Sequence, residues 1–340
     1  MPAVLALSRA QILAFRRRVG ALDARLPKGR RSLRLAAWAG LQDSMPRAAS
    51  LSIHARVAGT TATTWEDPSL VQLWGPRYST YVVAAKDLAF FSLGRLPDDA
   101  KGRKRAQDAA DRVESVLGVD NKLGYGHVGE ALGVNANSLR YGATTGRLVI
   151  RWEGARQPVL WCVPPPDITP EAARLELARR YLHVFGPATP ASFARWAGIT
   201  PAGGAAAFDA LAGSLTAVRA PIGTCWILSA DEADVRAAPG PDAPARLLPS
   251  GDAYYLLHGD DRTLLVPDAK RRAELWTTRV WPGALLVDGE IVGTWRRANE
   301  KVSIQTWRRL AAAEREAVVE ETESLPVPGL PGPIAITWKT

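Results

Sequence analysis

Two uncharged polar side chains, Gln42 and Ser44, stand two positions apart with Asp43 between them. In an extended segment, residues two apart point to the same side. The amide and the hydroxyl would then converge while Asp43 faces the other way. Gln42 cannot take up a proton near neutral pH, but its amide can orient a water molecule or contact a nucleotide. The alternative role for Gln42 is a turn-stabilising amide bonded to nearby backbone.

The surrounding sequence places Gln42 at a joint between two helices. Residues 33–39 are typical of a helix that ends at Gly40. A second helix is indicated by a proline in its first turn and an apolar stripe, at Pro46, Ala49, Ile53 and Val57. We therefore expect residues 41–44 to be extended.

The two neighbours of Gln42 also have structural interpretations. Ser44 stands two residues before Pro46, which favours a role as the N-cap of the second helix. Its hydroxyl reaches less far than an amide, so Ser44 is the weaker candidate for chemistry. We expect Asp43 to be a surface carboxylate paired with Arg47.

The run from Gly40 to Arg56, Gly-Leu-Gln-Asp-Ser-Met-Pro-Arg-Ala-Ala-Ser-Leu-Ser-Ile-His-Ala-Arg, resembles the signature of the AlkZ-like (YcaQ-like) winged-helix DNA glycosylases. The motif of that family is Gln, a hydrophobic residue, then Gln or Asp. Gln42 matches the first position, Asp43 stands at the hydrophobic position, and Ser44 replaces the second Gln or Asp. Residues 181–196 and 280–297 also resemble the family's third winged helix and C-terminal hairpin.

The resemblance implies tandem winged helices in a C-shaped clamp that excises alkylated purines, and in some members unhooks interstrand crosslinks. It implies a monofunctional DNA glycosylase without metal or cofactor, with water as nucleophile. Gln42 would be the principal catalytic group and Ser44 its partner. An alkylated purine is a cationic leaving group, so positioning and electrostatic stabilisation suffice. A clamp needs no partner subunit, which implies a monomer.

A helix-turn-helix followed by a hairpin recurs three times, at residues 8–83, 124–163 and 171–228. In the clearest copy, Thr189-Pro190 and Thr200-Pro201 open two helices as cap and first-turn proline. Two strands around a Pro-Ile-Gly-Thr turn then form the wing. This pattern predicts three tandem winged helix-turn-helix modules.

The last third of the chain has a different pattern. A strong Asp288-Gly289 turn predicts a β-hairpin, followed by a third strand at 301–307 and a charged helix at 308–323. The Pro-rich stretch 237–249 is the predicted linker, and 325–333 is expected to be irregular. The fold class is therefore α+β, with a C-terminal β-hairpin-rich portion. The expected boundaries are 1–100 with the motif, 101–166, 167–236 and 246–340.

The amino-acid composition limits the classes of protein to which this chain can belong. The 340 residues are 47% hydrophobic and 23% charged, which is ordinary for a soluble protein. No run of about 18 apolar residues predicts a membrane span, and the start of the chain does not read as a signal peptide. Cys162 and Cys225 are expected to be buried, reduced thiols of a cytoplasmic protein. The four histidines and two cysteines give no metal-ligand spacing.

The net charge of +9 favours a polyanionic partner, and we expect double-stranded DNA. The candidate DNA-contacting residues lie in or near the predicted modules and hairpins: Arg47, Arg77, Tyr78, Arg140, Arg147, Arg195, Arg296, Arg297 and Lys301. The basic runs 16–18 and 101–105 are expected to be solvated helix faces. The twelve tryptophans are expected to lie mostly in the core.

Two other functions remain open from the sequence. The chain can be a winged-helix DNA-binding protein without catalysis, such as a regulator or lesion sensor, which the Ser44 departure favours. It can also be a structural or protein-interaction module, which would show no salt-dependent DNA affinity.

Overall fold

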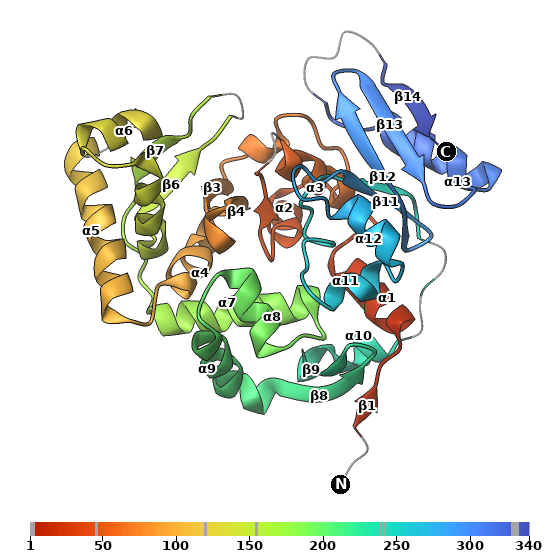
Figure 1. Cartoon of the computed structure of the whole chain (residues 1–340), viewed down its shortest axis with the longest axis horizontal. Coiled ribbons are helices and arrows are strands. Elements are labelled where there is room, and N and C mark those ends of the chain that lie inside the picture. The colour runs from red at the N-terminus through yellow and green to blue at the C-terminus, as the bar shows by residue number, and fades with distance from the viewer. Residues whose placement is uncertain are drawn as a thin grey trace.

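The computed structural model describes residues 4–44, 47–118, 121–153, 156–237, 240, 243–327 and 333–339. Helices and strands alternate along the chain, and the strands form three separate sheets. The predicted α+β class is confirmed. A sheet backed by helix α13 (Ala312–Glu323) lies at one end of the molecule, and helices α5 (Ala100–Leu117) and α6 (Tyr125–Ala131) lie at the other (Figure 1).

The N-terminal elements carry the motif region. They are β1 (Leu5–Ala6), α1 (Arg9–Val19), α2 (Arg30–Ala36), β2 (Leu41–Gln42), α3 (Ala48–Arg56), β3 (Leu70–Trp74), the 3-10 turn η2 (Pro76–Tyr78), β4 (Thr80–Ala84) and α4 (Leu88–Ser92). Gly40, between α2 and β2, has a backbone φ of +73, and a Cβ there would lie 2.9 Å from the Phe91 ring. Only glycine meets both conditions without strain, which explains the abrupt turn into β2.

A six-stranded sheet joins the hairpins of the first two pattern copies. Its order is β2-β4-β3-β6-β7-β5, with β5 (Leu123–Gly124), β6 (Leu148–Arg151) and β7 (Val159–Cys162). The two hairpins meet where Gln72 of β3 pairs with Ile150 of β6. The short helix between α6 and β6 is a 3-10 helix, η5 (Ala136–Thr145), capped by Asn135. The motif strand β2 forms one edge of this sheet.

The third copy has the predicted elements. They are α7 (Pro170–Phe185), α8 (Pro190–Ala197), α9 (Pro201–Leu211), β8 (Leu215–Ala220), β9 (Gly223–Leu228) and the short α10 (Glu232–Arg236). The side chains of Thr189 and Thr200 cap α8 and α9 by accepting backbone N–H bonds, as predicted. One pairing was not predicted. Strand β1 pairs in parallel with β8 and extends this hairpin to three strands.

The C-terminal portion is a five-stranded sheet with helices. Its elements are β10 (Arg246–Leu248), α11 (Asp261–Leu265), α12 (Ala269–Leu275), β11 (Gly283–Val287), β12 (Glu290–Ala298), β13 (Lys301–Thr306), α13 and β14 (Ala335–Lys339). The hairpin and third strand are confirmed, and α13 begins at Ala312 rather than at 308. The expected linker contains strand β10, which pairs with β11. Residues 328–332 of the expected irregular stretch lie outside the described residues.

The basic run at 16–18 corrects one expectation. Arg16 and Arg17 are 2% and 7% exposed, not solvated. Arg16 pairs with Asp261 at 2.9 Å, and Arg17 pairs with Asp23 at 2.8 Å. A charge run does not reveal which side of its helix faces the core, because a buried carboxylate from a distant segment can pair with it. The run at 101–105 is largely exposed, as predicted.

Candidate active site

Strand β2 and the two residues that follow it present Gln42 and Ser44 on one side. Leu41 and Asp43 are each 1% exposed, whereas Gln42 is half-buried and Ser44 is exposed. Gln42 Nε2 donates a hydrogen bond of 2.9 Å to Ser44 Oγ. The predicted extended geometry and the convergence of these two side chains are therefore confirmed. Gln42 Oε1 is inaccessible and has no hydrogen-bond partner among the described residues.

Asp43 is buried rather than exposed, which corrects the expectation of a surface carboxylate. Its Oδ1 accepts a hydrogen bond of 3.0 Å from the backbone N–H of Ala49, and its Oδ2 accepts one of 2.7 Å from Gln72. Arg47 lies 3.9 Å away, a long ion pair. Burial raises the pKa of Asp43 to about 6, although these hydrogen bonds and the charge of Arg47 act to lower it. Its alternation with Gln42 turns it into the protein.

Ser44 does not cap the following helix. Helix α3 begins at Ala48, and its N-cap position is Arg47, with a left-handed backbone at φ 66 and no side-chain cap bond. The carboxylate of Asp43 takes over this role, because it accepts the N–H of Ala49 at the start of α3. The Ser44 hydroxyl is thereby left to Gln42. Pro46, the predicted first-turn proline, lies outside the described residues.

Gln72 connects the motif strand to the second hairpin. Its Nε2 donates to Asp43, and its Oε1 accepts a 2.7 Å hydrogen bond from the backbone N–H of Trp152. Gln72 is 4% exposed, so both ends of its amide are satisfied within the protein. Through Gln72, Asp43 is thus attached to β3 and to the end of β6.

A loop of the C-terminal portion packs against the other side of Gln42. A Cβ built on Gly251 would lie 3.5 Å from Gln42 Cδ. The next residue, Asp252, is held by helix α3: it accepts hydrogen bonds from Ser52 at 2.6 Å and from both terminal nitrogens of Arg56 at 2.7 Å. The Arg56 and Asp252 side chains are 4% and 0% exposed. This buried pair fixes the position of the loop over Gln42.

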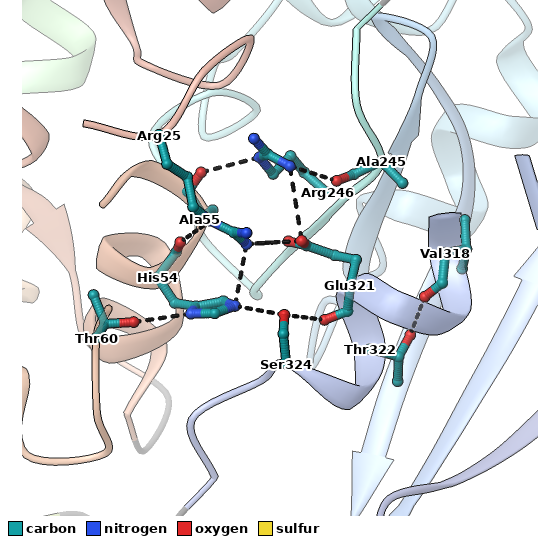
Figure 2. A network of polar contacts seen from close by, with 10 residues as sticks. All are labelled: Arg25, His54, Ala55, Thr60, Ala245, Arg246, Val318, Glu321, Thr322 and Ser324. Atoms are coloured by element: carbon teal, nitrogen blue, oxygen red, sulfur yellow. Dashed lines mark hydrogen bonds and ion pairs between the residues drawn. The ribbon is translucent and has the colours of Figure 1, made fainter. Parts of the chain in front are cut away.

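A second polar network joins α3 to helix α13 (Figure 2). The guanidinium of Arg25 contacts both Glu321 carboxylate oxygens, at 2.7 and 2.8 Å, and also His54 Nε2 at 3.1 Å. Ser324 lies 3.0 Å from the same His54 nitrogen. His54 is therefore structural. Together with Asp252, this network attaches the C-terminal sheet to the helix that follows the motif.

A cleft of about 360 Å³ lies beside Trp38 and His183. Another, of about 320 Å³, adjoins the motif helix. The second is lined by the first turns of α3, the loop before Gly251, and residues of β12: Ala48, Leu51, Pro249, Ser250, Val280, Trp281, Pro282, Gly283, Trp295, Arg296 and Arg297. It combines apolar and cationic walls next to the loop that covers Gln42.

The predicted DNA-contacting residues near the motif are partly held by aromatic rings. The Arg47 guanidinium lies 4.1 Å from the centre of the Trp65 ring and donates to the Trp152 carbonyl at 3.3 Å. Arg77 and Tyr78 lie in the turn η2, and the Tyr78 ring packs edge-on against Tyr141. Each of these arginines keeps part of its surface open to solvent.

The remaining predicted contacts are spread over the molecule. Arg140 lies on η5 with a buried Nε that has no partner among the described residues. Arg147 pairs with Asp111 at 2.5 Å and with Glu114 at 3.2 Å, so its charge is already compensated. Arg195 is exposed on α8. Arg296, Arg297 and Lys301 lie on β12 and at the start of β13, around the turn that joins these strands.

Within the part of the chain that the structure describes, His, Cys, Asp and Glu side chains form no group of three or more able to hold a metal ion. In the same residues, no helix has the length and apolarity needed to cross a membrane.

Several residues that build the site were not singled out from the sequence. Gln72, Gly251 and Asp252 lie far from Gln42 along the chain, and a single sequence does not report such contacts. A Gly-Asp pair after Pro249 does indicate a turn. It does not indicate what the turn packs against.

The chain has relatives both in sequence and in structure. A family model described as DNA glycosylase AlkZ-like matches residues 128–326. The structure is similar to that of Streptomyces sahachiroi DNA glycosylase AlkZ, with a TM-score of 0.76 and 17% sequence identity, over 98% of this chain and 100% of that one. At this identity the structural likeness shows the fold alone. No curated protein matches the chain by sequence. Because the family model covers more than half of its residues, the chain belongs to the AlkZ-like DNA glycosylase family.

Proposed function

We propose that this DNA-repair glycosylase hydrolyses the N-glycosidic bond between deoxyribose and an alkylated or bulky purine in double-stranded DNA. The observation that carries the proposal is the pairing of Gln42 and Ser44 at 2.9 Å, on one side of the extended segment 41–44, with Gln42 Oε1 left without a partner among the described residues. The family match supports a glycosylase over a non-catalytic regulator.

The proposed reaction needs positioning rather than strong acid or base chemistry. The bond between C1′ and the purine nitrogen breaks, and the cationic base leaves with the bonding electrons as a neutral molecule. Water forms the new bond to C1′ and releases its extra proton to solvent. Gln42 Oε1, which is inaccessible in the free protein, becomes accessible when DNA binds, accepts a hydrogen bond from that water and fixes its direction. Holding a nucleophile in line with the breaking bond lowers the activation free energy by several kcal/mol.

Ser44 serves this arrangement in two ways. By accepting the Gln42 Nε2–H, it fixes the amide so that Oε1 is the end without a protein partner and is left for the water once DNA binding exposes it. Its own hydroxyl proton stays available to a sugar or phosphate oxygen. Asp43 is not the base in this mechanism, because it is buried on the opposite side and bonded to Ala49 and Gln72.

The fold proposal follows the repeated pattern. We propose that the three helix-helix-hairpin units are winged-helix modules, with boundaries near residues 100, 166 and 236, and that they surround the duplex as a monomeric C-shaped clamp. Open basic residues on different units, such as Arg77, Arg195 and Lys301, would contact the phosphate backbone. The cleft beside Trp281 and Arg296 would leave room for a bulky adduct next to the motif.

The test uses duplex DNA that carries N7-methylguanine. The purified protein should release free 7-methylguanine and leave abasic sites that are cleaved by alkali. The Gln42→Ala variant should release none above background. Gln107→Ala is the matched control, because Gln107 is exposed on α5 and bonds only to Asp111. Salt-sensitive DNA binding without release from this or a bulkier N7 adduct would contradict the proposal.

A further inference from the structure

Three arginines from distant parts of the sequence converge on His258. Arg77 lies in the turn η2, Arg195 on α8, and Arg262 on α11. Arg77 Nη1 contacts His258 Nε2 directly. The pKa of His258 is lowered to about 4, first by burial and then by the positive charges of Arg77, Arg262 and Arg195. All three guanidinium groups thus act on one imidazole.

Close contacts of backbone and side chains bring these segments together. A Cβ on Gly198, which ends α8, would lie 3.0 Å from the backbone nitrogen of Arg77. A Cβ on Gly259 would lie 3.0 Å from Arg195 Nη1. Arg262 Nε donates to the carbonyl of Leu257 at 2.8 Å. The first hairpin, the third helix pair and the C-terminal portion therefore meet at this cluster.

The cluster has no counter-charge among the described residues. Arg77, Arg195 and Arg262 form no ion pair with any described carboxylate, whereas the buried Arg16 and Arg56 are both paired. Asp261, beside Arg262, is committed to Arg16. Asp260 is exposed and is not in an ion pair with any of the three. The pKa of Arg262 is lowered first by burial and then by the charge of Arg77, and the second cause is the expected effect of a nearby like charge.

We infer that Arg77, Arg195, Arg262 and His258 form one binding site for a phosphate group of the DNA backbone. Like charges held together without a carboxylate destabilise the free protein, and a bound anion removes that cost. Guanidinium groups suit this role because they bind phosphate oxygens through paired N–H groups. Arg195 is exposed, and Arg77, Arg262 and His258 are partly exposed, so a ligand can reach them.

The location suits a phosphate close to the lesion. Gln42 pairs with Tyr81 across β2 and β4, and Arg77 precedes Tyr81 by four residues. Four residues span at most about 14 Å, and one strand pairing adds about 5 Å. The backbones of Arg77 and Gln42 are therefore within roughly 20 Å, which is less than one turn of duplex DNA. The inference rests on the proposed function for its choice of DNA as the anion.

The test compares Arg195→Gln and Arg262→Gln with the wild type in duplex DNA binding over a range of salt concentrations. Each variant should raise the dissociation constant about tenfold near 0.1 M salt and reduce the slope of log K against log salt by about one. Arg236→Gln is the control, because Arg236 is exposed on α10 and pairs only with Glu232. Variants that bind as tightly as this control, with unchanged slopes, would overturn the inference.

A second readout separates binding from folding. Without DNA and at low salt, Arg195→Gln should raise the melting temperature by roughly 1–2 °C, because a repulsive charge is removed. Pyrophosphate should stabilise the wild type more than the Arg195→Gln/Arg262→Gln double variant. Equal stabilisation of the two proteins would overturn the site whatever DNA does.

These results are independent of base release. If the wild type releases no base but its DNA affinity depends on the arginines, the phosphate site stands and the proposed activity fails. If base is released and the arginine variants bind normally, the activity stands and the site fails. A wild-type protein without salt-dependent DNA affinity would overturn both.

Discussion

The side-chain amide of Gln42 and the hydroxyl of Ser44 are joined by a 2.9 Å hydrogen bond across a single intervening residue. The bond exists because β2 is extended and because Asp43, turned inward, takes the helix N-terminus that Ser44 would otherwise cap. The motif residue that departs from the family pattern is therefore still in contact with the residue that matches it. This contact predicts that Ser44 takes part in the reaction.

The rate of base release by Ser44 variants should depend on whether the new side chain can accept a hydrogen bond from the Gln42 amide. Ser44→Ala removes the acceptor and should slow base release about tenfold, in line with the loss of one hydrogen bond of about 1 kcal/mol or slightly more. Ser44→Asp keeps an acceptor and adds a charge near the oxocarbenium-like sugar, so its rate should equal or exceed that of the wild type. Single-turnover rates on 7-methylguanine DNA measure both. An unchanged rate for Ser44→Ala would remove Ser44 from the mechanism.

Gly251 should control the position of Gln42. The Gly251→Val side chain would press on the Gln42 amide, since a Cβ alone already lies 3.5 Å from Cδ. We expect slower base release with nearly unchanged affinity for DNA. Gly133→Val is the matched control, because Gly133 also has a left-handed backbone, at φ +61, but has nothing within 4 Å of its Cβ position. Both variants carry the same backbone strain, so equal losses of rate would mean that contact with Gln42 is irrelevant.

The buried pair between Arg56 and Asp252 should dominate the attachment of the C-terminal loop to α3. Arg56→Met or Asp252→Leu alone leaves one buried charge unpaired and should lower the free energy of unfolding by about 3–5 kcal/mol. The double variant should lose much less than the sum of the two. Chemical denaturation measures all three. The exposed pair Lys104–Asp108 is the comparison, and its removal should cost less than about 1 kcal/mol. Additive losses at Arg56 and Asp252 would contradict the pairing.

His54 should make stability sensitive to acid. Its Nε2 faces Arg25, and burial together with the charges of Arg25 and Arg246 lowers its pKa from 6.5 to about 4. Between these values the unfolded chain binds the proton and the folded chain does not, so acidification favours unfolding. The stability that His54 supplies is full above pH 6.5 and is lost as the pH falls towards 4.

The difference in the free energy of unfolding between the wild type and His54→Gln isolates the contribution of His54 from that of other titrating groups. Asp43 acts in the opposite direction, because its pKa is raised from 3.8 to about 6 in the folded protein. Its stabilising contribution is therefore greatest at low pH and is lost as the pH rises through about 6. Denaturation at pH 7.5 and at pH 4.5 should show the wild-type advantage over His54→Gln shrinking on acidification. An advantage that stays constant would show that the His54 pKa is not depressed.

Local sequence signals predicted most elements of the fold. Threonine-proline caps at 189–190 and 200–201 fixed two helix starts, and Asp288-Gly289 fixed a hairpin, because these residue types act on the nearest turn of backbone. Pairings between distant segments were not predictable. Strand β1 joins β8, and β14 joins β13 in parallel, and neither pairing has a local signature.

At the site, too, local sequence signals predicted some features, while contacts between distant segments were not predictable. The alternation along 41–44 predicted that Gln42 and Ser44 converge, since that follows from strand geometry alone. Burial of Asp43 depends on Gln72, and the cover over Gln42 depends on Gly251, each more than 25 positions away. The roles of Ser44 and Asp43 at the helix start were interchanged in the prediction. Both types cap helices well, and only the tertiary fold decides which one faces the N-terminus of α3.

In the proposed reaction, Gln42 positions the water that attacks the sugar. The most direct test is the single-turnover rate of 7-methylguanine release by Gln42→Ala and by wild type, with the dissociation constant of each for the same duplex. We expect the Gln42→Ala rate to be at least about 100-fold lower with affinity changed less than threefold, and the Gln107→Ala rate to equal that of the wild type. Release by Gln42→Ala at the wild-type rate would show that Gln42 does not position the water.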